Sequence, residues 1–221
     1  QYTALMETEG VRVDFSEDTS SFKVPCVIVT TSAENWSMEE LSSVAIDDEK
    51  AGETIVDYLI EHGHTKIAEI GANLELSQTA ILRHNGYLNS FKKHGITPDE
   101  RYYERARFSY DSAYHAMKKL LEKNIEITAV YAISDVMAIG AIRAILDKGL
   151  RVPEDISITG FDGSTLAEYY NPKIVSIRQP HKDMAARSVE LLFNMIDLHK
   201  GSCHEIIPFE LTEGESVARI D

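Results

Sequence analysis

Short apolar runs alternate along the chain with longer stretches in which apolar residues recur every three or four positions. The apolar runs predict buried strands over residues 24–30, 66–71, 101–108, 128–133, 156–161, 174–178 and 205–211. The helical spacing predicts helices after Asp47 and Asp48, before Gly95, over 112–123, from Asp135 onward and over 184–198. Alternating strands and helices of this length predict an α/β fold with parallel sheets covered by helices on both faces.

The first 23 residues follow neither pattern. No strand–helix–strand unit can be assigned to them. They are typical of a short strand with loops, or of segments joined across a missing part of the sequence.

The net charge, the cysteines and the lack of long apolar stretches indicate which partners and which compartment suit the chain. The net charge is −14, and a surface that negative repels phosphate backbones, so this stretch is a poor candidate for touching DNA or RNA itself. The two cysteines, Cys26 and Cys203, are far apart and fit a reducing cytoplasm. The chain has no apolar stretch of about 18 residues and no signal-peptide pattern at its start, so no membrane contact is expected.

The sequence lacks the common catalytic and cofactor-binding motifs. The sequence contains neither glycine-rich phosphate loop, G-x-x-x-x-G-K-[ST] or G-x-G-x-x-G, and no G-x-S-x-G nucleophile elbow. Its histidines never fall in the H-E-x-x-H arrangement of zinc sites. We therefore expect no cofactor, no metal and no enzyme activity, although catalytic groups that meet only in space would leave no such motif.

Four stretches carry a family resemblance. They are VAIDDEKAGETIVDYLIEHGHTKIAEIG (44–71), ILRHNGYLNSFKKHGI (81–96), TAVYAISDVMAIGAIRAILDKGLRVPEDISITGFDG (128–163) and NPKIVSIRQPHKDMAARSVELL (171–192). In this order and spacing they resemble the lactose/galactose-repressor (LacI/GalR) family of transcriptional regulators and its relatives among the periplasmic sugar-binding proteins. The GLRVPEDISITGFDG segment is more similar to the repressors.

The resemblance implies two Rossmann-like α/β subdomains joined by three crossing strands, with a sugar or sugar derivative bound in the cleft between them. It divides the chain into an N-terminal subdomain (1–45 and 180–211) and a C-terminal subdomain (46–179 and 212–221). It also implies a homodimer and a preceding helix-turn-helix head. Neither that head nor the opening βα units can be recognised here, so the N-terminal subdomain is expected to be incomplete. The chain is then truncated, or its first 23 residues replace those parts, and operator DNA is reached only through the absent head.

Strand ends and the loops after them form the cleft in open α/β sheets. On the resemblance, the candidate ligand-binding residues are Thr30, Ile46, Thr79, Arg83, Phe108, Ser134, Asp135, Asp162, Gln179 and His181. Arg83 is expected at the cleft rim, where its fork of donors suits adjacent sugar hydroxyls and its removal leaves folding nearly intact. The alternative is a surface arginine paired with a carboxylate.

The other candidates also have structural alternatives. Asp162 is the expected acceptor for ligand hydroxyls, or a simple turn residue before Gly163. Phe108 is expected to end a strand and stack on a sugar face, or to belong to the core. Asp135 is expected to be a helix N-cap first and a ligand neighbour second. Ser134 stands where relatives show asparagine.

The resulting hypothesis is the effector-binding and dimerisation core of a cytoplasmic bacterial repressor. Ligand holds a closed arrangement of the subdomains and so changes the DNA affinity of the head. The alternatives are an exported sugar-binding protein of a transport system and an enzyme on the same fold.

Overall fold

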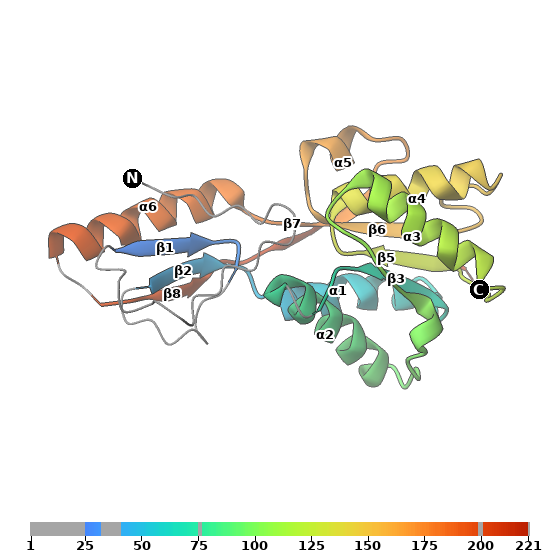
Figure 1. Cartoon of the computed structure of the whole chain (residues 1–221), viewed down its shortest axis with the longest axis horizontal. Helices are drawn as coiled ribbons and strands as arrows, with labels where there is room; N and C mark the ends of the chain where they lie inside the picture. Colours follow the sequence, from blue (N-terminus) through green and yellow to red (C-terminus); the bar gives the residue numbers. More distant parts are fainter. Residues whose placement is uncertain (1–24, 32–40, 75–76, 199–200, 221) are drawn as a thin grey trace.

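A computed structural model describes residues 25–31, 41–74, 77–198 and 201–220, which form two sheets lying end to end (Figure 1). The interpretation of the first 23 residues lies outside this part. The smaller sheet has the order β1-β2-β8 and is parallel throughout. Its strands are β1 (Cys26–Val29), β2 (Leu41–Ala45) and β8 (His204–Ile206), and helix α6 (His181–Leu198) packs on it.

The larger sheet has the order β4-β3-β5-β6-β7-β9. Its strands are β3 (Ile67–Gly71), β4 (Tyr103–Arg105), β5 (Ala129–Ala132), β6 (Ser157–Asp162), β7 (Val175–Arg178) and β9 (Glu210–Thr212). Helices α1 (Asp48–Glu61) and α2 (Gln78–Lys93) lie on one face, and α3 (Tyr110–Glu122) and α4 (Asp135–Asp147) on the other (Figure 1). The short helix α5 (Thr165–Tyr169) follows β6. The predicted α/β class is confirmed.

Helices on both faces explain the apolar runs in the sequence. Strands β3 and β5 are buried along their whole length, so both of their faces must avoid water. Side chains at the helix starts satisfy backbone N–H groups that have no partner within the helix. Asp47 caps α1, as its position predicted, by accepting from the N–H of Lys50 at 2.9 Å.

Three sequence predictions differ from the structure. Helix α4 is capped by Ser134 and not by Asp135, because the Ser134 hydroxyl accepts from the N–H of Met137 at 3.2 Å. The strand predicted over 101–108 is a 3₁₀ turn (Glu100–Tyr102) followed by the three-residue β4. The strand predicted over 205–211 is two strands, β8 and β9, in different sheets.

The division of the strand predicted over 205–211 has a simple cause. Pro208 lies between β8 and β9, and a proline has no N–H with which to continue a ladder. Beyond it, β9 runs antiparallel to β7, so the larger sheet is mixed and not purely parallel. We keep the two-subdomain division as a proposal, with its last boundary moved from 211/212 to a point before β9.

Candidate functional site

A cavity of about 400 Å³ lies where the two sheets meet. Thr30 directly follows β1 of the smaller sheet, whereas Asp162 ends β6 and Gln179 follows β7 of the larger one. Carboxyl ends of parallel strands are the expected position for a ligand in such folds. The lining residues are Thr30, Thr79, Arg83, Phe108, Asp162, Gln179 and His181. Seven of the ten candidates therefore come together around one pocket.

Arg83 projects from α2 into the base of this pocket and not from its rim. The residue is only 3% exposed. Its Nε donates to Oδ1 of Asp48 at 2.8 Å, and its Nη1 donates to the carbonyl of Ile133 at 2.6 Å. The guanidinium also lies 3.6 Å from the centre of the Phe161 ring. The expectation of an arginine at the cleft rim is therefore wrong. A buried ion pair also speaks against the expectation that removing Arg83 leaves folding nearly intact.

Asp48 supplies the negative charge that a buried guanidinium needs. Burial raises the pKa of the Asp48 carboxyl, and the Arg83 charge opposes that rise. An arginine side chain does not lose its proton in proteins, so the carboxylate is retained as its counter-charge. Sequence reasoning missed Asp48 as part of the site. It had the signal of a helix start, and nothing along the chain connects position 48 with position 83.

Asp162 faces Arg83 from the end of β6. Its Oδ1 lies 3.8 Å from Nη1 of Arg83 and accepts from Nε2 of Gln179 at 2.9 Å. Burial raises the pKa of the Asp162 carboxyl to about 6, the Arg83 charge opposes this, and the Asp135 charge adds to it. The backbone of Asp162 has φ of 110°, in the left-handed region. Asp162 is thus both a turn residue and a pocket residue, so the two interpretations of it are compatible.

Gly163 follows in the same tight turn, with φ of 63°. A Cβ added there would lie 2.5 Å from Cα of Arg178, so any larger residue would displace the neighbouring strand β7. The turn therefore aims the Asp162 carboxylate at the pocket.

Three candidates do not line the pocket. Ile46 is 2% exposed and belongs to the core. Ser134 is occupied in capping α4. Asp135 accepts from the N–H of Ser164 and from the hydroxyl of Ser176, both at 2.6 Å. These polar groups already have partners within the fold, and we withdraw the three residues as ligand contacts.

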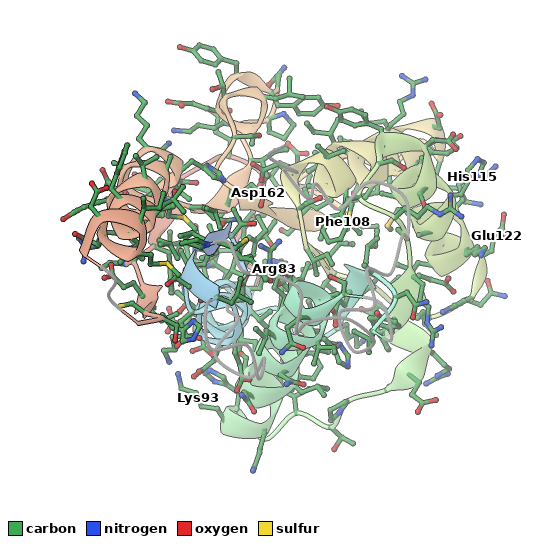
Figure 2. All side chains as sticks on the ribbon, turned by 60° about the vertical axis from the view of Figure 1, so that its left-hand side comes forward. Arg83, Lys93, Phe108, His115, Glu122 and Asp162 are labelled. Carbon is green, nitrogen blue, oxygen red and sulfur yellow. The ribbon has the colours of Figure 1, made fainter. Side chains whose placement is uncertain are left out.

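The remaining candidates differ in their surroundings. Phe108 lies in the loop after β4 and is 43% exposed, so the alternative that it belongs to the core is wrong. The hydroxyl of Thr79, on α2, lies 2.9 Å from the hydroxyl of Thr31, which follows β1. This hydrogen bond joins the two sides of the pocket. Figure 2 shows Arg83, Phe108 and Asp162 grouped in the middle of the view; they come from α2, from the loop after β4 and from the end of β6.

Neither metal binding nor membrane crossing finds support in the described ranges. No group of three or more histidine, cysteine, aspartate or glutamate side chains is placed there to hold a metal ion. No helix in the same ranges is both long and apolar enough to cross a membrane.

Comparison with known proteins identifies the family. The family model described as "Periplasmic binding protein-like domain" matches residues 56–217. The chain belongs to this family. Among curated proteins it is 38% identical to the HTH-type transcriptional regulator MalR of Clostridium butyricum, over 96% of this chain and 63% of the relative. It is 34% identical to the HTH-type transcriptional repressor PurR of Vibrio atlanticus, over 80% of this chain and 52% of the relative.

Solved structures similar to this chain also include transcriptional regulators. The complex of the transcriptional regulator CelR with cellobiose has a TM-score of 0.79 and 27% identity, covering 90% of this chain and 67% of that one. A LacI-family regulator from Enterococcus faecium with bound ribose has a TM-score of 0.79 and 26% identity, covering 89% and 72%. The resemblance to the lactose/galactose-repressor family is confirmed. The chain spans between about half and two thirds of the length of these curated relatives.

Proposed function

We propose that this chain is the effector-binding core of a cytoplasmic bacterial transcriptional repressor and binds a sugar or sugar derivative in the pocket between its two sheets. The observation that carries the proposal is the pairing of Arg83 with Asp162 in a cavity of about 400 Å³. Small-molecule sites in proteins have about this volume, with a few convergent polar groups that fix orientation. The cellobiose and ribose complexes of similar regulators support the ligand class.

The position of the pocket supports a role in the control of DNA binding. Thr30 and His181 line it from the smaller sheet and its helix, whereas Arg83 and Asp162 line it from the larger sheet. A ligand that touches both sides stabilises one arrangement of the two halves more than another, and this difference in affinity shifts the population. We propose that a homodimer transmits the shift to a helix-turn-helix segment beyond this chain.

The competing functions have less support. An exported sugar-binding protein of a transport system would share the same domain family, but the relatives above are named as transcriptional regulators. For the same reason we propose that the protein is not an enzyme.

A thermal-shift screen tests the proposal. The panel is cellobiose, maltose, ribose, their phosphate esters and the purine bases. A cognate ligand at a hundredfold its Kd stabilises the fold by about 2.7 kcal/mol, which raises the melting temperature measurably. Stabilisation by a sugar would support the proposal. Stabilisation by a purine alone would contradict the ligand class, and a flat response across the panel would count against effector binding.

A further inference from the structure

The positive charge of Arg83 is already matched by protein groups. Its guanidinium donates to the Asp48 carboxylate at 2.8 Å and to the Ile133 carbonyl at 2.6 Å. A second carboxylate, Asp162, lies 3.8 Å away. Among the described residues that line the pocket, Arg83 is the one arginine or lysine, so two carboxylates share one cation there. With Asp162 ionised, the base of the pocket carries a net negative charge.

Apart from the remaining N–H groups of Arg83, the polar atoms that line the pocket include several acceptors. The Asp162 carboxylate has lone pairs beyond the one used by Gln179. The Oε1 atom of Gln179 is buried and has no hydrogen-bond partner among the described residues. The hydroxyl of Thr30 can both donate and accept. Acceptors of this kind need a ligand that donates, which a hydroxyl group does and a phosphate dianion or carboxylate does not.

We propose that the pocket selects uncharged, hydroxyl-rich ligands over anionic ones, and that Asp48 is the positioning residue that sets this selectivity by holding the guanidinium of Arg83. This inference rests on the proposed function. Asp48 is 2% exposed and contacts the arginine from behind, so it acts on the ligand only through Arg83. Without the Asp48 carboxylate, Arg83 keeps only Asp162, 3.8 Å away, as a counter-charge. Its planar fork, the arrangement that binds phosphate and carboxylate groups, then loses its closest ionic partner.

Inorganic phosphate is the probe for the selectivity, because it requires no knowledge of the natural effector. A LacI-family regulator from Escherichia coli complexed with phosphate, similar to this chain with a TM-score of 0.76, shows that phosphate is a reasonable probe for proteins of this fold. Isothermal titration of wild type and Asp48→Asn with phosphate at neutral pH gives the comparison. We expect at least about a tenfold gain in phosphate affinity for Asp48→Asn over wild type.

Asp57→Asn is the matched control. Asp57 lies on the same helix, α1, and is also a buried carboxylate that binds α2. It accepts from Ser90 and Lys93 at 2.6 Å each and from His94 at 3.0 Å. Lys93 lies well away from Arg83 in Figure 2, so this cluster is remote from the pocket. Asp57→Asn should match wild type in phosphate affinity, because it disturbs α1–α2 packing without freeing Arg83.

The outcomes separate the two proposals. Equal phosphate affinity in wild type and a folded Asp48→Asn variant overturns the role of Asp48, and a gain shared by Asp57→Asn does the same. If Asp48→Asn does not fold, the selectivity is tested on wild type alone. Its affinity for ribose is compared with that for ribose 5-phosphate, and its affinity for cellobiose with that for cellobiose 6-phosphate. A wild-type preference for the phosphorylated members contradicts the selectivity but leaves effector binding intact. Binding of a neutral member at least about tenfold tighter supports it.

Discussion

At the scale of single residues, the pocket depends on an arginine that has two tasks. Arg83 offers donors to a ligand, and it also forms a buried ion pair with Asp48 beneath the pocket surface. Removing one partner of a buried pair leaves the other charge desolvated and unmatched. Binding and stability are therefore coupled at this position.

Arg83→Ala should lower both properties. We expect the free energy of unfolding to fall by about 3–5 kcal/mol, because Asp48 is left as an unpaired buried carboxylate. Charged hydrogen bonds to a ligand contribute roughly 1.5–3 kcal/mol each, so affinity should fall about tenfold to a hundredfold or more. Arg83→Lys should recover only part of the affinity, since an ammonium lacks the planar fork. Urea denaturation and calorimetric titration measure the two effects.

A double variant separates these two tasks. Arg83→Met combined with Asp48→Asn removes both charges, so much of the lost stability should return while ligand affinity stays low. Unchanged stability in Arg83→Ala would contradict the buried pair. Unchanged affinity in a folded Arg83→Ala protein would contradict the placement of the ligand.

Asp162 should make stability depend on pH. Its pKa of about 6 in the fold lies above the ordinary value of 3.8, so the folded state holds this proton more tightly than the unfolded chain. The stabilisation is fully present below about pH 4 and is lost as the pH rises towards 6. Asparagine also adopts left-handed backbone conformations, so Asp162→Asn should fold. Because it has no carboxyl group at this position, it does not lose this stability as the pH rises. Its stability relative to wild type should therefore increase between pH 4 and pH 7 in urea denaturation. A difference independent of pH would show that the carboxyl is not perturbed.

At the scale of secondary-structure elements, the position of α2 depends on its close contact with α1. A Cβ added at Gly86 of α2 would lie 2.3 Å from the carbonyl oxygen of Glu49. A Cβ added at Gly52 of α1 would lie 2.7 Å from the carbonyl oxygen of Arg83. Backbone-to-backbone contact at this crossing sets how far Arg83 reaches towards the pocket.

Gly86→Ala should therefore force the helices apart. Overpacking of this kind costs about 1–3 kcal/mol, and the better helix propensity of alanine returns at most about 1 kcal/mol. We expect a net loss of stability together with weaker ligand binding, because Arg83 moves with α2. Gly201→Ala is the control: nothing lies within 4 Å of its added Cβ, and its stability should stay within about 0.5 kcal/mol of wild type. Equal stability of the two variants in urea denaturation would contradict the close crossing.

At the scale of the whole molecule, the pocket between the sheets favours a small ligand, whereas the net charge disfavours contact with DNA. The two sheets present a ligand pocket where they meet, while the chain as a whole carries a net charge of −14. Such a surface repels the phosphate backbone, whose attraction to cationic side chains provides most non-specific DNA affinity.

This chain alone should therefore bind duplex DNA no better than an acidic control protein at physiological salt. Gel-shift titration at two salt concentrations is the measurement. Affinity that falls steeply with salt, or selectivity between operator-like sequences, would show that these 221 residues contain a DNA-reading surface.

The sequence by itself determined the α/β class, most strands and helices, and seven of the residues that line the pocket. Buried strands and amphipathic helices leave local periodic signals. The pocket residues were implied by the family resemblance, together with the rule that residues directly after a strand lie at the edge of a sheet. The sequence misplaced those features that depend on neighbours far along the chain. Asp135 is held by Ser164 and Ser176, which lie 29 and 41 positions further along the chain, and no local pattern reveals these contacts.

Only the tertiary structure decided the chemistry of the pocket. Asp48 and Arg83 are 35 positions apart, and the ion pair exists because α1 and α2 pack closely enough to bring them to 2.8 Å. The same packing buries Arg83, and burial gives that residue its role in stability as well as in binding. Periodicity reports which side of an element avoids water, but not which partner an adjacent element supplies. The pairing of charges was therefore decided by the folded chain.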